Sequence, residues 1–232
     1  MKKIAIATAL LIASTAQADT LYGLYADANY WHTSADVTDN GVNQNYDDEG
    51  NYMLSASLEH GVPLIPNVRV RHADISHSQN TAITRDEVAF TSTDAIAYYE
   101  ILDNVVSVDL GLGAKRISGD VKYTGGTTLD LNKTLPMAYA SVGAKLPFTG
   151  LSAKAELGVG VGSNVKATDA QAEIKYDFVK TAAIDLGIKG GYRVLSLDYD
   201  EMDVKYLGNV FGSQVPYKAD FKGPYVGVEV HF

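Results

Sequence analysis

Phe221-Lys-Gly-Pro-Tyr-Val-Gly-Val-Glu-Val-His-Phe232 ends the chain, and its residues alternate between two kinds of side chain. One face of this stretch is wholly apolar, with Pro224, Val226, Val228, Val230 and Phe232. The other face includes the carboxylate of Glu229 and the imidazole of His231. Successive side chains of a β-strand point to opposite sides, so this pattern is typical of a strand that separates lipid from water. The last residues therefore predict an all-β protein whose outer surface meets lipid.

The first residues predict export. Lys2 and Lys3 precede an apolar segment, residues 4–13, and Ala16-Gln17-Ala18 has the small-x-small pattern of a cleavage site. These three ordered regions are typical of a secretory signal peptide, and the apolar segment is too short to span a bilayer as a helix. We expect a signal peptide at 1–18 and one mature domain at 19–232, because no linker-like composition break follows.

The composition excludes several classes of function. The formal net charge is −9, and it falls to −11 without the two lysines of the leader, so the chain repels nucleic acid. Cysteine is absent, which excludes disulfides and thiolate metal sites. We expect no cofactor and no nucleic-acid partner.

Ten segments of the mature chain alternate in the same way as the last one. They are residues 21–31, 52–60, 68–75, 88–101, 106–115, 138–146, 153–162, 170–178, 184–194 and 221–232. The connections after odd segments are long (33–51, 76–87, 116–135 and 198–220), with 163–168 as the one short member, and those after even segments are short. Long outer loops and short inner turns predict a closed antiparallel transmembrane barrel, of ten strands or alternatively eight or twelve. In the third segment Ala73 and Ile75 fall out of phase, so we expect a β-bulge near His72.

This pattern, with its terminal Phe232, resembles the superfamily of small Gram-negative outer-membrane β-barrels, the OmpA/OmpX-like and porin-like proteins. The segments 98–104 and 109–113 resemble a narrower group of outer-membrane proteins of unknown function. The resemblance implies an outer-membrane location, with the bilayer lipid and lipopolysaccharide as partners, and a monomer. It also implies that the assembly machinery reads Val228, Val230 and Phe232 as a C-terminal signal.

A soluble periplasmic β-sandwich is the structural alternative, because its strands also alternate. It would bury the apolar face against a second sheet and expose the polar face to solvent. The leader, the aromatic terminus and the alternation of loop lengths favour the barrel.

Ionisable residues of both signs fall on the face predicted to point into the barrel. We expect them to form an ionic network that fills the lumen: Glu59, Arg69, Arg71, Glu100, Asp109, Lys115, Lys145, Lys154, Glu156, Glu173, Lys175, Asp185, Lys189, Arg193 and Glu229. Small barrels are usually filled by side chains, and unpaired charges away from water are costly. A structural or surface-interaction role is the first hypothesis, and a narrow porin-like channel for small solutes is the alternative.

Enzymatic and metal-binding functions find little support in the sequence. No histidine stands at a suggestive spacing from a serine nucleophile, so we expect no catalytic residues. The acidic run Asp198-x-Asp200-Glu201-x-Asp203 lacks the glycine and distal glutamate of a calcium loop, so we expect no metal site. An outer-membrane enzyme remains a further alternative.

Overall fold

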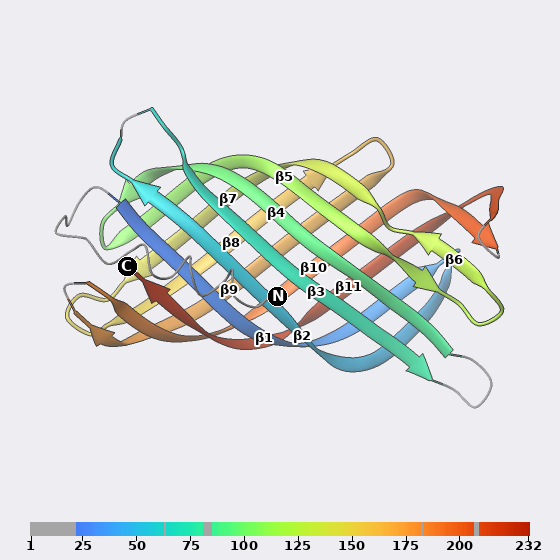
Figure 1. Cartoon of the computed structure of the whole chain (residues 1–232), viewed down its shortest axis with the longest axis horizontal. Helices are drawn as coiled ribbons and strands as arrows, with labels where there is room; N and C mark the ends of the chain where they lie inside the picture. Colours follow the sequence, from blue (N-terminus) through green and yellow to red (C-terminus); the bar gives the residue numbers. More distant parts are fainter. Residues whose placement is uncertain (1–21, 63, 81–84, 182, 207–208) are drawn as a thin grey trace, which may run out of the picture.

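Eleven antiparallel β-strands make up the part of the chain that the computed structural model describes, which is residues 22–62, 64–80, 85–181, 183–206 and 209–232 (Figure 1). The strands are β1 (Tyr22–Asp39), β2 (Val42–His60), β3 (Asn67–Asn80), β4 (Arg85–Asp103), β5 (Val106–Lys122), β6 (Thr127–Asp130), β7 (Lys133–Lys145), β8 (Leu151–Val161), β9 (Val165–Lys180), β10 (Asp185–Tyr206) and β11 (Asn209–His231). The predicted signal peptide lies outside the described residues. Among the described residues, no helix is long and apolar enough to cross a membrane.

The sheet closes on itself. Each long strand pairs with its neighbours in sequence, β5 pairs with β7, and β1 pairs with β11 from Tyr25↔His231 to Asp39↔Tyr217. The backbone of Phe232 also exchanges two hydrogen bonds with that of Leu24. The predicted closed antiparallel barrel of ten strands is therefore confirmed, and β6 is a short additional strand.

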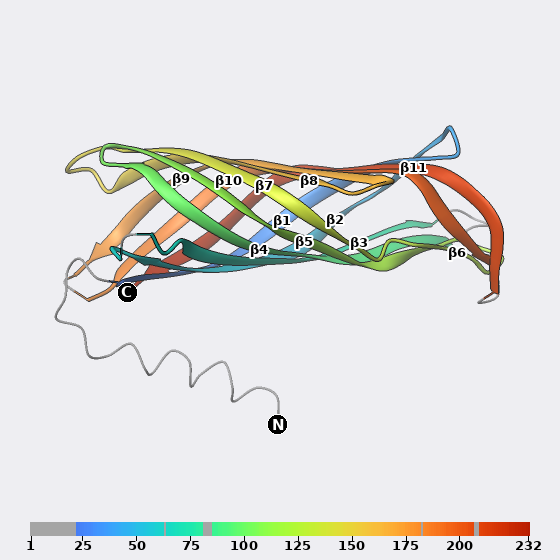
Figure 2. The same cartoon turned by 90° about the horizontal axis from the view of Figure 1, so that it is seen from above.

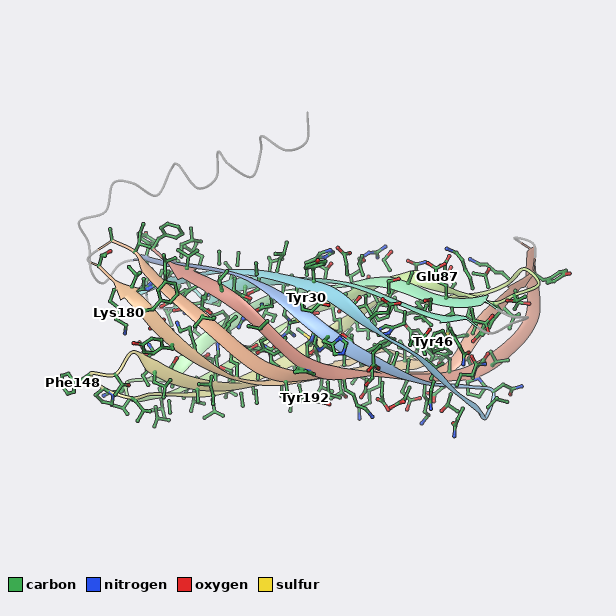
Figure 3. All side chains as sticks on the ribbon, turned by 90° about the horizontal axis from the view of Figure 1, so that it is seen from below. Tyr30, Tyr46, Glu87, Phe148, Lys180 and Tyr192 are labelled. Carbon is green, nitrogen blue, oxygen red and sulfur yellow. The ribbon has the colours of Figure 1, made fainter. Side chains whose placement is uncertain are left out.

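A band of apolar side chains covers the outside of one half of the barrel. Aromatic rings lie at both borders of this band: Tyr22, Tyr99, Phe148 and Tyr176 at one border, and Tyr30, Tyr52 and Tyr192 at the other. Figure 3 shows Phe148 at one end of the barrel and Tyr30 and Tyr192 near the middle of its length. An apolar band between two aromatic girdles is typical of a transmembrane barrel.

The predicted long outer loops are instead continuations of the strands. β1 and β2 run on to a tight turn at Asn40-Gly41, where both residues have positive φ (46° and 81°). Asn-Gly with left-handed backbone at both positions is the preferred two-residue hairpin turn. The acidic run from Asp198 likewise lies within β10. Figure 2 shows the resulting long cylinder.

The barrel narrows towards the hairpin end. β8 ends at Val161 and β9 begins at Val165, so neither strand reaches the hairpin end. There β6 fills the gap by pairing with β5 and with β10. The ring at this level consists of β11, β1, β2, β3, β4, β5, β6 and β10. A barrel of about eight strands has an interior that side chains alone can fill.

The third strand corrects a second expectation. No register shift interrupts β3, so there is no bulge near His72. Ala73 and Ile75 point into the barrel, on the same face as Arg69 and Arg71, and are almost fully buried. The alternation never changed phase here; the chemical character of the inner face changed.

The same change occurs on the other long strands and divides the barrel into two halves. We call the region with ionisable inner residues the charged half and the region with apolar inner residues the apolar half. On the charged side of the border, the inner faces carry Asn29 on β1, Arg71 on β3, Asp94 on β4, Lys115 on β5 and Arg193 on β10. On the apolar side of the border, the same strands carry Trp31, Ala73, Phe90, Ile117 and Leu195. The outer faces change in the opposite sense, from apolar to polar.

Candidate functional site: the charged lumen

Asp169 on β9 is the centre of the charged lumen. Its carboxylate lies 3.1 Å from Arg71, 3.0 Å from Lys115 and 2.8 Å from Arg193, which come from three other strands. A second acid, Asp94, lies 2.7 Å from Arg71 and 2.6 Å from Lys115. All five side chains are buried. We call these five residues the Asp169 cluster. It lies in the charged half, directly beside the border with the apolar half.

Glu156 on β8 organises the next layer. It pairs with Arg69, lies 2.9 Å from Lys154, and accepts a hydrogen bond from the Tyr139 hydroxyl at 3.0 Å. Gln171 also donates to this carboxylate, at 2.6 Å. Arg71 lies 3.5 Å away and connects this layer to the Asp169 cluster.

A third layer lies nearer the short-turn end. The Lys189 ammonium lies 3.2 Å from Asp27, 3.4 Å from Glu173 and 3.4 Å from Glu229. Lys175 lies 2.7 Å from Glu229. Each ammonium here has several carboxylates around it, which compensates for the loss of water.

The predicted lumen residues divide into those that the structure brings together and those at the mouth. Eleven lie in these layers: Arg69, Arg71, Asp109, Lys115, Lys154, Glu156, Glu173, Lys175, Lys189, Arg193 and Glu229. Glu59 accepts a hydrogen bond from Tyr98, whereas Glu100 and Lys145 are exposed at the short-turn mouth. Asp185 is also at that end, 3.8 Å from His231.

Sequence reasoning missed Asp169 because the eighth alternating segment was begun one residue later. Val165, Ala167, Asp169 and Gln171 in fact continue a single inward face of β9. The available signal was an acidic residue directly before the predicted start of the segment, at a position that continues the inward-facing alternation.

A small vestibule opens at the short-turn mouth. It has a volume of about 150 Å³ and is lined by Tyr25, Glu59, Arg69, Glu100 and Lys154, among others. A separate cavity of only about 10 Å³ is lined by Asp27, Arg69, Arg71 and Gln171, among others. The side chains of Lys115, Asp169 and Arg193, in the Asp169 cluster, are almost completely inaccessible to solvent.

The apolar half closes the lumen a second time. The Arg193 guanidinium lies over the Trp31 ring, 4.7 Å from its centroid. Above Trp31, the rings of Phe90 and Phe221 pack edge to face at 5.1 Å, and Tyr199 and Tyr217 follow at 6.3 Å. These rings belong to one continuous cluster of buried apolar residues.

Histidine–carboxylate pairs lie on the outer wall and at the mouth. The fullest arrangement is His72, whose Nδ1 lies 2.7 Å from the Thr93 hydroxyl and whose Nε2 lies 3.4 Å from Asp74. These side chains project from paired strands, where backbone N–H groups are used by the ladder and cannot stabilise an oxyanion. Among the described residues, no group of three or more His, Cys, Asp or Glu side chains could hold a metal ion.

Comparison with known proteins finds no matching family model and no match among curated proteins. Among solved structures, the translocator domain of the autotransporter NalP from Neisseria meningitidis is similar over 89% of this chain and 88% of its own, with 12% identity and a TM-score of 0.41. The outer-membrane protease OmpT from Escherichia coli is similar over 90% and 97%, with 7% identity and a TM-score of 0.39. The outer-membrane protein AlkL is similar over 94% of each chain, with 11% identity and a TM-score of 0.33. The fold assignment rests on the chain's own strand pairing, which is that of a closed antiparallel β-barrel.

Proposed function

We propose that this protein is a non-conducting barrel of the Gram-negative outer membrane, with a structural or surface-interaction role. The observation that carries the proposal is the double closure of the lumen, first by the layers of ion pairs and then by the apolar core. A channel for ions needs a continuous wet path, and buried rings such as Trp31 and Phe221 offer none.

The distribution of outward residues supports the orientation in the membrane. The apolar band fits the hydrocarbon layer, and the apolar half then stands beyond it as a water-exposed stalk. Its outer wall carries exposed ion pairs such as Lys222–Asp36, which is close to the Tyr192 girdle, and Lys218–Asp198, which is further along β10. We propose that this wall contacts the polar part of lipopolysaccharide and that the hairpin tips face outward.

Planar-bilayer recording tests the proposal. The wild type is expected to show no single-channel events in conditions where a porin inserted in parallel conducts. Steady conductance of the wild type would instead favour the narrow channel.

A variant in the ion-pair layers makes the test sharper. Arg71→Ala leaves Asp94 and Asp169 with fewer partners and opens space below the apolar half. It is expected to lower the free energy of unfolding by about 3 kcal/mol. It should nevertheless stay silent in the bilayer, because the apolar core above it is intact.

A further inference from the structure

The wall of the apolar half has one seam that backbone hydrogen bonds do not close. β2 and β3 pair from Leu58↔Val68 to Tyr52↔Asp74, and the ladder between them ends there. Both strands continue, β2 pairing with β1 as far as Val42 and β3 pairing with β4 as far as Asn80. Each strand thus has one laddered side and one side that faces the other without a ladder.

Side chains close this seam instead. Asn51 on β2 accepts a hydrogen bond from the Ser76 backbone N–H at 2.9 Å, which fixes the orientation of its amide. From β3, the ring of His77 and the amide of Gln79 each lie 3.0 Å from a backbone carbonyl of β2, those of Asp47 and Asn45. These contacts replace backbone hydrogen bonds, and we call them the seam latch.

The latch requires one protonation state of His77. The Asp47 carbonyl can only accept, so Nδ1 of the ring must carry the proton. The Asn51 amide nitrogen lies 3.4 Å from Nε2 and can only donate, so Nε2 must be unprotonated. A second proton on the ring would place two donors against each other.

The surroundings of His77 also oppose a charge. The side chain is fully buried and packs against the Phe221 ring at 5.6 Å, and Val88 lies opposite it on β4. Burial lowers the pKa of His77, while the Asp47 carbonyl and the carboxylates of Glu49 and Asp48 on β2 work in the opposite direction without cancelling it.

We propose that the seam between β2 and β3 is a pH-sensitive latch: protonation of His77 releases it and opens the wall of the apolar half. The His77 pKa is lowered in the closed wall, so the closed seam binds fewer protons than the open one. Closure is therefore favoured above the ordinary histidine value of about 6.5 and is lost as the pH falls below it. At pH 5 the opening equilibrium constant should rise by up to about 30-fold over that at pH 7.5.

Hydrogen exchange of the full-length protein in lipid nanodiscs, read by residue-resolved NMR at pH 7.5 and pH 5, tests this proposal. After correction for the intrinsic effect of pH on exchange, the Ser76 amide should lose about 10- to 30-fold of its protection at pH 5. Amides in the laddered part of the same strand pair, such as those of residues 53–58, should keep theirs. Equal loss in both segments, or none in either, would overturn the latch.

Two variants separate His77 from other titrating groups. His77→Gln cannot gain a proton, so protection at Ser76 should become independent of pH whatever its starting value. His72→Gln changes an outward histidine on the same strand and should leave the wild-type pH dependence in place. If His77→Gln does not fold, the ring signals of His77 in the wild type decide: titration of the ring without a change at Ser76 contradicts the proposal.

Discussion

The two halves of this barrel solve opposite problems with the same backbone. In the charged half the outer face meets lipid, so the apolar residues lie outside and the ionisable residues must pair inside. In the apolar half the outer face meets water, so the apolar residues lie inside as in a soluble barrel. The inversion occurs at one level around the wall, and that level marks the border of the apolar band towards the hairpin end.

The comparison also explains why the halves differ in width. In the charged half, long side chains from opposite walls form ion pairs and fill the interior of a ring of ten strands. The contacts of Asp169 with Arg71 and Lys115 are examples. Apolar side chains pack best without voids, and β6 reduces the ring to eight strands where most of the inner side chains are apolar. The short strand is therefore part of the packing solution of the apolar half.

The largest effect is expected in the charged half. Asp169→Asn removes the carboxylate that three buried cations share, and should lower the free energy of unfolding by about 3 to 5 kcal/mol. Denaturant unfolding in lipid vesicles measures this. The control is Asp36→Asn, which breaks an exposed pair with Lys222 and should leave the unfolding midpoint unchanged. Similar midpoints for both variants would mean that the cluster is not a stabilising network.

A cavity should be costly in the apolar half and cheap on the lipid face. Ile75→Ala leaves a void in a packed core and should lower the free energy of unfolding by about 2 to 4 kcal/mol. Val70→Ala, five residues away on the opposite face of β3, should cost less than about 1 kcal/mol because lipid chains fill the space. If Val70→Ala were the more damaging change, the assignment of faces on β3 would be wrong.

The sequence predicted the charged half far better than the apolar half. Strand number and facing follow from period-two alternation, which is complete within segments such as residues 106–115. Beyond Trp31 or Arg193 the alternation persists, but the apolar residues move to the inner face, so a search for an outward apolar face interprets these stretches as loops. The turn Asn40-Gly41 was the local sign of a hairpin there.

Partners inside the lumen could not be predicted. Arg71 meets Asp169 across 98 residues of sequence, and this contact depends on the register of several intervening strands. Alternation says that a side chain points inward; only the closed geometry decides which opposite charge it reaches.

A charge on the outer face should distinguish the two solvents. Leu110→Arg places a cation in the apolar band and should lower the free energy of unfolding by about 2 to 4 kcal/mol if it lies near the bilayer midplane. Thr168→Arg is also on the outer face, but beside the polar Ser196 of β10, and should have almost no effect. Refolding into vesicles followed by denaturant titration gives both values. Equal losses of unfolding free energy would mean that the border of the apolar band has been assigned incorrectly.

The smallest effect is expected where β6 joins the ring through a surface ion pair. Burial opposes ionisation of Asp130, but its hydrogen bonds with Lys205 and Asn132 outweigh burial and lower its pKa. The stabilisation is therefore present above the ordinary aspartate pKa of 3.8 and is lost as the pH falls through the lower, folded-state value.

Asp130→Asn should lower the free energy of unfolding by about 0.3 to 1 kcal/mol at pH 7 and remove this acid dependence. Leu129→Ala, the adjacent residue in the apolar core, should cost about 2 to 4 kcal/mol at every pH. Denaturant titrations at pH 7 and pH 3 compare the two variants. If Asp130→Asn proved the more damaging at pH 7, the surface ion pair would stabilise the position of β6 more than the buried Leu129 side chain does.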